Sequence, residues 1–341
     1  MTAAEKVLAL DTEVVCVRGG SSVMGVGAYL PPAVIRMEGL LDEIRTEERF
    51  GIPSTWLSEN TGILESRIAA PGQKPSELAV AAAEQALAES GVDPSQIGAV
   101  IYCGIDRDYA EPATAHVVQS ELGIPGGMCF DLSSACHGFV NGMQVVNSLI
   151  MEGSISYGLV VSGEIPSRVA RGVTENLKRG GKDLFMRQVG ALTTGDAGGA
   201  MVLGPGRGIK EFKLMSRGQH YKLCHYNRAP DGSIDGELIM HKICHEGLKM
   251  HRELWRLRFW HPDALDKVIS HQVGRAFHER LARIIGVAQH KMSCTFPRLG
   301  NLTSTTIPVN LALLPKRKPT KRILIAGSGS GISISHIAME Y

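Results

Sequence analysis

The sequence lacks the features of a secreted or membrane-spanning protein. None of its seven cysteines belongs to a C-x-x-C pair, and their odd number and irregular spacing favour a reduced, cytoplasmic compartment. No apolar run approaches the about 18 residues of a transmembrane helix. The first twenty residues carry Glu5, Lys6, Asp11 and Glu13 among short apolar runs, which excludes a signal-peptide core.

A strong excess of charge is also lacking. The formal net charge is +2 and charged residues make up 21% of the chain, so the composition gives no reason to expect a nucleic acid or another charged polymer as partner. Glycine is abundant instead, with 39 residues, which fits the tight turns of an α/β protein. A length of 341 residues allows a large core and suggests about two domains.

One internal repeat supports a duplicated architecture. The segments D-P-S-Q-I-G-A-V-I-Y-C (93–103) and H-P-D-A-L-D-K-V-I-S-H (261–271) share a proline and a V-I pair at the same offsets. Each follows a predicted helix and begins a predicted strand. Two copies of a helix-turn-strand unit predict a duplicated α/β fold.

The most informative stretch runs from Met128 to Ile150. A short apolar run ends at Asp131, a turn of small residues presents Cys136, and apolar residues then recur at helical spacing. A cysteine at a helix N-terminus can have a lowered pKa, because unpaired N–H groups and the helix dipole favour the thiolate. Cys136 is therefore a candidate nucleophile, and the alternative is a small buried thiol.

Two further residues could assist such a nucleophile. His271 ends the buried strand V-I-S-H, where its side chain would emerge at the carboxyl edge of a sheet. Asn301 follows Gly300 at the start of a helix. A satisfied histidine at a strand end and an ordinary helix N-cap are the alternative interpretations.

Taken together, these stretches resemble the thiolase superfamily, and within it the β-ketoacyl synthase III group. The resemblance spans nearly the whole chain from Val23 to Tyr341 and rests on order and spacing as well as on single motifs. The matching pieces are G-A-Y-L-P (27–31), T-G-I-L-E-S-R-I-A (61–69), D-L-S-S-A-C-H-G-F (131–139), T-T-G-D-A-G-G-A (193–200), I-S-H-Q (269–272), G-N-L-T-S (300–304) and G-S-G-S-G (327–331).

The resemblance implies a five-layered αβαβα thiolase fold made of two duplicated halves, and a homodimer. We expect a leader at 1–21, an N-terminal half at 22–205 and a C-terminal half at 206–341. It also implies acyl thioester substrates, with coenzyme A or the phosphopantetheine arm of an acyl carrier protein as part of the substrate and no separate cofactor or metal. The G-S-G-S-G loop looks like a dinucleotide fingerprint, but no βαβ unit follows it, so we reject a nicotinamide site.

The same resemblance assigns a Cys-His-Asn triad to Cys136, His271 and Asn301. Cys136 would carry the acyl group, while His271 and Asn301 would polarise the thioester carbonyl of the second substrate. The oxyanion of the first half-reaction would bind backbone N–H groups of Cys136 and of the loop near Ser330. The expected product is a β-keto compound formed by a Claisen condensation.

Glu111 decides between subgroups. The segment R-D-Y-A-E-P-A-T-A (107–115) looks like the thiolases that join two acyl chains head to head in olefin, β-lactone and some pyrone pathways. There a glutamate is thought to enter the partner's site and remove an α-proton, which a substrate without a malonyl carboxylate needs. The alternatives are a solvated loop carboxylate, a decarboxylating synthase that uses malonyl thioester, acyl transfer to a non-carbon nucleophile, and a silent paralogue.

Substrate contacts depart from the pattern of the chain-initiating synthases. Trp56 matches the tryptophan that stacks on the adenine of coenzyme A, but Asn60 stands where those enzymes have an arginine. Arg168 begins a basic run that also holds Arg171, Lys178, Arg179 and Lys182. This run is predicted to meet a phosphate or an acidic carrier, or to be a solvated face.

Overall fold

Two five-stranded sheets form the centre of the molecule. The computed structural model describes residues 13–228, 232–315 and 321–341. The first sheet has the order β2-β8-β7-β5-β6, in which β8 is antiparallel to both neighbours and the other pairs are parallel. Its strands are β2 (Ser21–Tyr29), β5 (Ile97–Tyr102), β6 (Met128–Asp131), β7 (Tyr157–Glu164) and β8 (Ala197–Pro205).

The second sheet repeats this topology. Its order is β1-β9-β14-β13-β12, and β9, β14, β13 and β12 take the places that β2, β8, β7 and β5 hold in the first sheet. A single parallel bridge between Val268 and Met292 stands where the first sheet has β6. Its strands are β1 (Val14–Arg18), β9 (Ile209–Ser216), β12 (Lys267–Ser270), β13 (Arg322–Gly329) and β14 (Ser333–Glu340).

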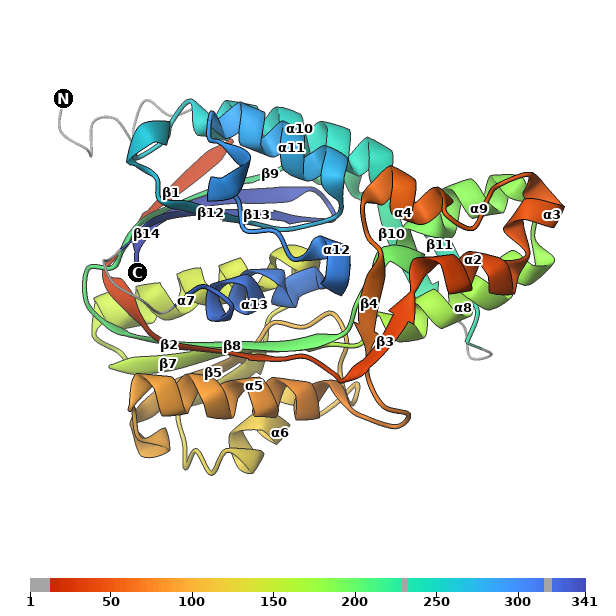
Figure 1. Ribbon diagram of the computed structural model, residues 1–341. Coiled ribbons are helices and arrows are strands. Elements are labelled where there is room, and N and C mark those ends of the chain that lie inside the picture. The colour runs from red at the N-terminus through yellow and green to blue at the C-terminus, as the bar shows by residue number, and fades with distance from the viewer. Residues whose placement is uncertain (1–12, 229–231, 316–320) are drawn as a thin grey trace.

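Helices complete five layers (Figure 1). The middle layer, between the sheets, holds α7 (Gly138–Glu152) and α13 (Thr306–Ala312). One outer layer holds α5 (Pro75–Ser90) and α6 (Thr114–Glu121) on the first sheet, and the other holds α10 (Met240–Trp255) and α11 (Arg275–Ile285) on the second. The five-layered fold expected from the sequence is confirmed.

The sequence repeat corresponds to equivalent elements of the two halves. A 3₁₀ turn, Pro94–Gln96, leads into β5, and a second one, Pro262–Ala264, leads into β12. The alanines of α5 also have a structural reason. A Cβ built on Gly27 would lie 1.9 Å from the carbonyl oxygen of Ala82, so the helix backbone touches the sheet and only small residues fit between them.

The central helix α7 buries most of the residues that the helical spacing selects, and only Leu149 among them is half-buried. Phe139, Val140, Met143 and Val146 are at most 1% exposed and pack between the two sheets. Full burial of such side chains contributes roughly 1.5–3 kcal/mol each. Helix α7, which follows the candidate nucleophile, is therefore held in place by both sheets.

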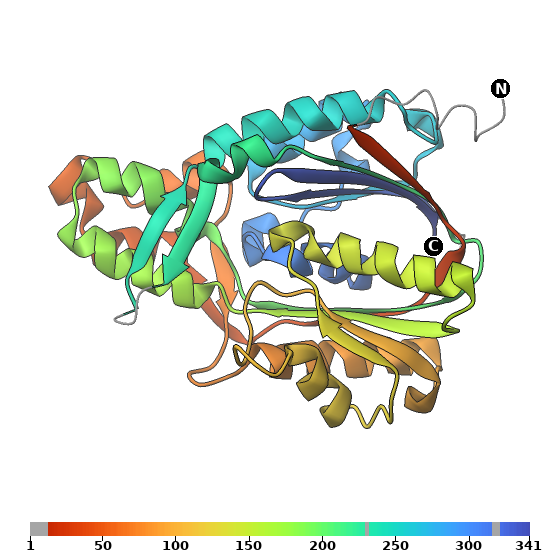
Figure 2. The same cartoon turned by 180° about the vertical axis from the view of Figure 1, so that it is seen from behind.

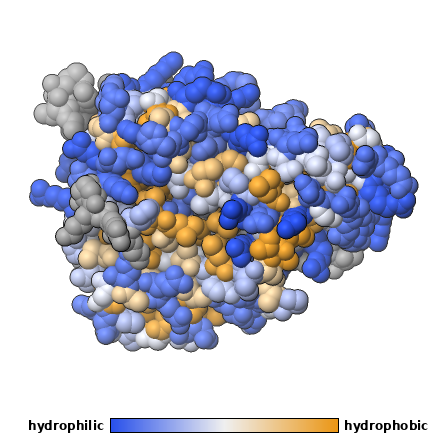
Figure 3. Space-filling model, viewed as in Figure 1, coloured by the Kyte–Doolittle hydropathy of each residue, from blue (hydrophilic) through white to orange (hydrophobic). Residues whose placement is uncertain are grey.

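A lobe at one end of the layers, at the right of Figure 1, covers the approach to the middle layer. The hairpin of β10 and β11 lies against α8 and α9 there (Figure 2). Hydrophobic residues gather over the middle of the face in Figure 3, whereas the far end of the lobe is hydrophilic. The lobe comprises β3 (Ala33–Arg36), α2 (Met37–Ile44), α3 (Thr46–Phe50), α4 (Trp56–Thr61), β4 (Glu65–Ile68), α8 (Ser167–Arg179), α9 (Lys182–Gln188), β10 (Cys224–Arg228), β11 (Ile234–Leu238) and α12 (Phe296–Leu299).

Three segments differ from simple expectations. The predicted leader, 1–21, includes β1 and the first residue of β2, and its residues 1–12 lie outside the described part. The sequence of residues 52–60 predicts a loop, but these residues contain most of α4. The glycine-rich, mixed stretch 205–235, which the sequence suggests as the boundary between the halves, contains β9 and β10. Among the described helices, none has both the length and the apolar character that a bilayer span requires.

Candidate active site

Cys136 lies on a strained turn between β6 and α7. Ala135 has a φ of +48°, a left-handed conformation that a residue with a Cβ adopts at a cost. The turn is a 3₁₀ helix, Ala135–His137, that runs directly into α7. The backbone thus projects Cys136 into a pocket at the N-terminal end of the central helix.

Burial dominates the ionisation of Cys136. The apolar surroundings raise the pKa of the thiol, and the nearby Cys224 and Glu164 raise it further. The lowered pKa expected from the helix N-terminus is therefore wrong. The resting nucleophile is a thiol, so acyl transfer needs a group that takes its proton.

His271 is the group placed for that purpose. It follows β12, and its backbone N–H donates to the carbonyl of Ala326 at 3.0 Å. The next residue, Gln272, fixes this strand end, because its side-chain oxygen accepts the N–H groups of Thr295 and Phe296 at 2.9 and 3.0 Å. Burial, with a smaller effect of His137, lowers the pKa of His271 to about 4. The imidazole is therefore neutral near pH 7.

Asn301 is held with its amide nitrogen free. Its side-chain oxygen accepts the backbone N–H of Thr303 at 3.0 Å, so the Nδ2 group is left as the donor toward the site. Its own backbone is tied to Thr193 and Gly195 by hydrogen bonds of 2.9 and 3.0 Å. This bond is of the kind a helix cap makes, and it leaves the amide N–H groups of Asn301 for another partner.

Cys136, His271 and Asn301 line the same pocket. The pocket contains about 970 Å³ of empty space, open solvent at its mouth included. Its walls are mostly apolar and come from the lobe and from α10 and α11. They include Val169, Leu238, Met240, Ile243, Val273 and Phe277. Such a space suits an acyl chain whose reacting carbonyl lies near the three polar residues.

The buried histidines predict loss of stability in acid. The pKa values of His137, His251, His271, His278 and His336 are all lowered by burial. Below the ordinary value of about 6.5 the unfolded chain binds protons that the native protein does not, so the free energy of unfolding falls by about 1.4 kcal/mol per pH unit for each histidine that stays neutral. Denaturant titrations at pH 7, 6 and 5 measure this slope.

A matched pair of variants controls for other groups. His278→Gln should lower the slope, whereas His261→Gln should leave it unchanged because His261 is exposed. Equal slopes in both variants would contradict burial as the cause.

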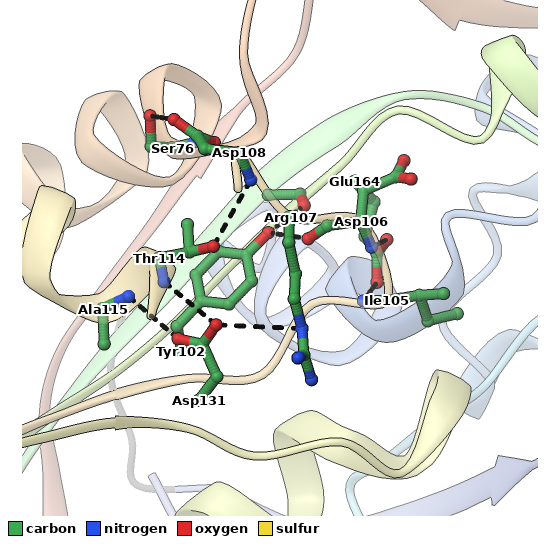
Figure 4. A network of polar contacts seen from close by, with 11 residues as sticks. Ser76, Tyr102, Ile105, Asp106, Arg107, Asp108, Thr114, Ala115, Asp131 and Glu164 are labelled. Atoms are coloured by element: carbon green, nitrogen blue, oxygen red, sulfur yellow. Dashed lines mark hydrogen bonds and ion pairs between the residues drawn. The ribbon is translucent and has the colours of Figure 1, made fainter. Parts of the chain in front are cut away.

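Glu111 lies outside the pocket, at the exposed tip of the loop between β5 and α6. The loop beneath it is anchored (Figure 4). Asp108 accepts the N–H and hydroxyl of Ser76 at 3.0 and 2.6 Å, and Arg107 lies 3.8 Å from Asp131, which accepts the first N–H groups of α6. Glu111 is thus exposed on an anchored loop and is not among the residues that line the pocket of its own chain.

The remaining predicted residues divide into two groups. Ser330 lines the pocket, and its hydroxyl donates to the sulfur of Cys224 at 3.3 Å. Trp56 and Arg168 do not line it. The ring of Trp56 packs edge-on against Phe185 in the lobe, and Arg168 donates to the carbonyl of Gln73 at 2.7 Å.

Several pocket residues were missed at the level of sequence. Cys224 and Cys244 place two more thiols on the walls, and Tyr226, Asp106 and Glu164 add polar groups. Glu164 could have been identified from the sequence, because it stands at the end of the buried strand β7, much as His271 stands directly after β12. Of the others, Cys224 and Tyr226 lie on β10, Cys244 on α10 and Asp106 in a loop, and which way they face depends on packing that the sequence does not show. The described residues contain no group of three or more His, Cys, Asp or Glu side chains with a metal-binding arrangement.

Comparison with known proteins assigns the family. Residues 130–218 match the model of 3-oxoacyl-[acyl-carrier-protein (ACP)] synthase III, and residues 258–341 match the model of its C-terminal part. The chain belongs to the 3-oxoacyl-[acyl-carrier-protein] synthase III family. It is accordingly an acyltransferase of the condensing type.

Individual relatives fall into two groups. The chain is 29% identical to an acyl-CoA:acyl-CoA alkyltransferase of Shewanella oneidensis, over 86% of this chain and 90% of that protein. It is 28% identical to a β-ketoacyl-[acyl-carrier-protein] synthase III of Rhodospirillum rubrum, over 92% and 97%. A crystal structure of an OleA variant from Xanthomonas campestris superposes with a TM-score of 0.88 at 26% identity, covering 95% of this chain and 97% of that one.

Proposed function

We propose that this enzyme joins two acyl thioesters head to head, without decarboxylation, through an acyl group carried on Cys136. The observation that carries the proposal is that Cys136, His271 and Asn301, from three distant stretches of the chain, line one apolar pocket. A nucleophilic thiol, a neutral imidazole and an amide donor are the groups that thioester exchange and enolate formation require.

The first half-reaction transfers an acyl group to sulfur. The sulfur of Cys136 attacks the thioester carbonyl as His271 takes its proton, and the oxyanion is stabilised by backbone N–H groups of Cys136 and the Ser330 loop. The carbon-sulfur bond to the carrier then breaks, and the carrier thiolate takes the proton from His271. The products are the acyl enzyme and a free carrier thiol.

The second half-reaction forms the carbon-carbon bond. Glu111 of the partner subunit removes an α-proton from the second thioester, whose carbonyl oxygen accepts hydrogen bonds from His271 and Asn301. The enolate carbon attacks the acyl carbonyl, the bond to Cys136 breaks, and the cysteine thiolate takes up the proton that Glu111 removed, so the product is a β-ketoacyl thioester. The exposed position of Glu111 supports action in the partner's site.

The structures of Xanthomonas campestris OleA support the same arrangement. Variants of that protein have been solved with a glutamate, a cysteine or a histidine replaced, and these three residues follow along its chain in the same order as Glu111, Cys136 and His271. A cysteine-to-serine variant of that protein is solved with lauric acid and lauroyl-CoA. We therefore infer coenzyme A as the carrier and a cytoplasmic location, where the free cysteines of the described chain stay reduced.

A homodimer would bring Glu111 to the second site. Edge strand β6 carries Met128 and Phe130, which are 47% and 36% exposed. An apolar edge strand of this kind is a surface for pairing with another chain. Met128→Lys should therefore give a monomer that has lost condensation. Light scattering after gel filtration measures the mass, and Met151→Lys, which changes an equally exposed methionine at the end of α7, is the control.

The proposal is tested by intact mass after incubation with lauroyl-CoA, with parallel analysis of extracted products. A mass gain at Cys136 together with a β-keto acid, or the ketone formed from it, supports head-to-head condensation. A stable adduct without product, and release of labelled carbon dioxide from a malonyl thioester, would replace it with decarboxylating synthesis.

A further inference from the structure

Glu164 is a buried carboxyl group in the pocket of Cys136 to which the proposed reaction assigns no role. It ends β7, lines the pocket and is 1% exposed. Its hydrogen-bond partners in the described chain are two backbone N–H groups and one hydroxyl, with no cation among them. The three donors favour the carboxylate, but burial without a cation and the nearby Asp106 outweigh them, so the neutral form is favoured.

The contacts of Glu164 join two segments of the site. The N–H of Ile105 donates to Oε1 at 3.0 Å and the N–H of Asp106 donates to Oε2 at 3.3 Å, at the turn that leads toward Glu111 (Figure 4). On its other side Glu164 is bound by the hydroxyl of Ser304, which also lies 2.6 Å from the hydroxyl of Ser162.

Ser304 belongs to the segment that carries the catalytic amide. It follows Thr303, whose N–H holds the side-chain oxygen of Asn301 and whose backbone also bonds to His271. Glu164 therefore connects the base of the Glu111 loop, from the N-terminal half, to the Asn301 segment, from the C-terminal half. One side chain spans the two halves at the site.

The groups that interact with Glu164 electrostatically are all neutral or acidic. They are Tyr102, Cys103 and Asp106 from β5 and the loop after it, Cys136 before α7, and Tyr226 of β10. Burial, and then the charge of Asp106, raises the pKa of Glu164 to about 8. The Glu164 carboxyl group is therefore mostly protonated at neutral pH.

We propose that Glu164 is a positioning residue that must keep its proton during acyl transfer: its carboxyl group holds the 105–106 turn and the Ser304 segment together, and its ionisation places a competing negative charge in the pocket of Cys136. The inference rests on the proposed function. Acyl transfer creates an oxyanion and a carrier thiolate in this pocket, and a fixed carboxylate there opposes both. The acylation rate should therefore fall as the pH rises above 8. A thiol without such a neighbour would show the opposite, because more of it becomes the reactive thiolate.

The test is the pH dependence of Cys136 acylation. Single-turnover rates with lauroyl-CoA are measured by intact mass from pH 6 to 9.5 for the full chain and for Glu164→Gln, which keeps the shape of the neutral group. The natural enzyme should lose about tenfold between pH 7.5 and 9, and the variant less than about twofold. Glu84→Gln, an exposed site on α5, should follow the natural enzyme.

Two further measurements separate this role from a purely structural one. Asp106→Asn removes the neighbouring charge, so it should move the alkaline loss of rate to lower pH, the opposite of Glu164→Gln, and it serves as the test if Glu164→Gln does not fold. The raised pKa also means that the native protein loses stability relative to Glu164→Gln as the pH rises from about 5 to 8. Thermal unfolding of both proteins at these pH values measures that difference.

The inference is overturned if the natural enzyme and Glu164→Gln share one profile, or if the natural rate rises steadily through pH 9. Failure of the proposed function looks different, because it shows either as no adduct on Cys136 at any pH or as an adduct that gives no condensation product, and neither depends on Glu164.

Discussion

Cys136→Ala should form no acyl enzyme and should lower product formation by at least about 1,000-fold, because no other group can carry the acyl chain between the two half-reactions. Intact mass after incubation with lauroyl-CoA shows the adduct, and chromatography of the extracted lipids shows the product. The change removes one sulfur atom from the end of a rigid turn, so the fold should be retained.

Cys224→Ala is the matched control, since Cys224 is a second thiol on the wall of the same pocket. Burial raises its pKa as well, and it bonds to Ser330. Its replacement should leave the adduct on Cys136. An adduct on Cys224, or normal turnover by Cys136→Ala, would remove Cys136 from its assigned role.

Glu111→Gln should separate the two half-reactions. The variant should acylate Cys136 at a rate within about twofold of normal, because the exposed loop tip of one chain does not touch the pocket of that chain. Condensation should fall by about 100-fold or more, which is the usual contribution of a general base. Stopped reactions show the acyl enzyme accumulating while the β-keto product is missing.

A mixture of variants tests whether the glutamate acts across the dimer. In a heterodimer of Cys136→Ala and Glu111→Gln, one of the two sites has both a cysteine and a glutamate if Glu111 reaches the partner, and none has both if it acts in its own chain. Random re-association should then restore about a quarter of the natural activity. Glu121→Gln, at the exposed end of α6, is the control for a carboxylate nearby. No recovery on mixing would contradict action in the partner's site.

The parts of the fold governed by local pattern could be predicted from the sequence. The bounds expected for α5 agree with the structure, because a proline starts the helix and Gly91, with a φ of +65°, ends it. The duplication was visible because the same turn and strand recur before β5 and β12. The element α4 was expected as a loop, since a helix of one to two turns carries too few residues for a periodic signal.

The sequence predicts which residues form the site, but it does not predict how the surrounding protein changes their pKa values and packing. Motif spacing selected Cys136, His271 and Asn301, and the structure brings them to one pocket. The raised pKa of Cys136 depends on the apolar walls supplied by α10 and the lobe, which no local pattern describes. Trp56 has the residue type of an adenine platform, but packing against Phe185 gives it a place in the core of the lobe.

Because the topology is repeated, the site lies between two related halves of the chain, and both supply residues to it. Cys136 stands just before α7 and Asn301 stands before α13, which occupy the same place in the middle layer, and His271 follows β12 as the inert, buried Cys103 follows β5. Equivalent positions of the two halves therefore carry side chains with different chemical properties. Cys136 comes from the first copy, and His271 and Asn301 come from the second. Neither copy alone therefore contains all three residues of the site, and a functional site needs both copies packed together.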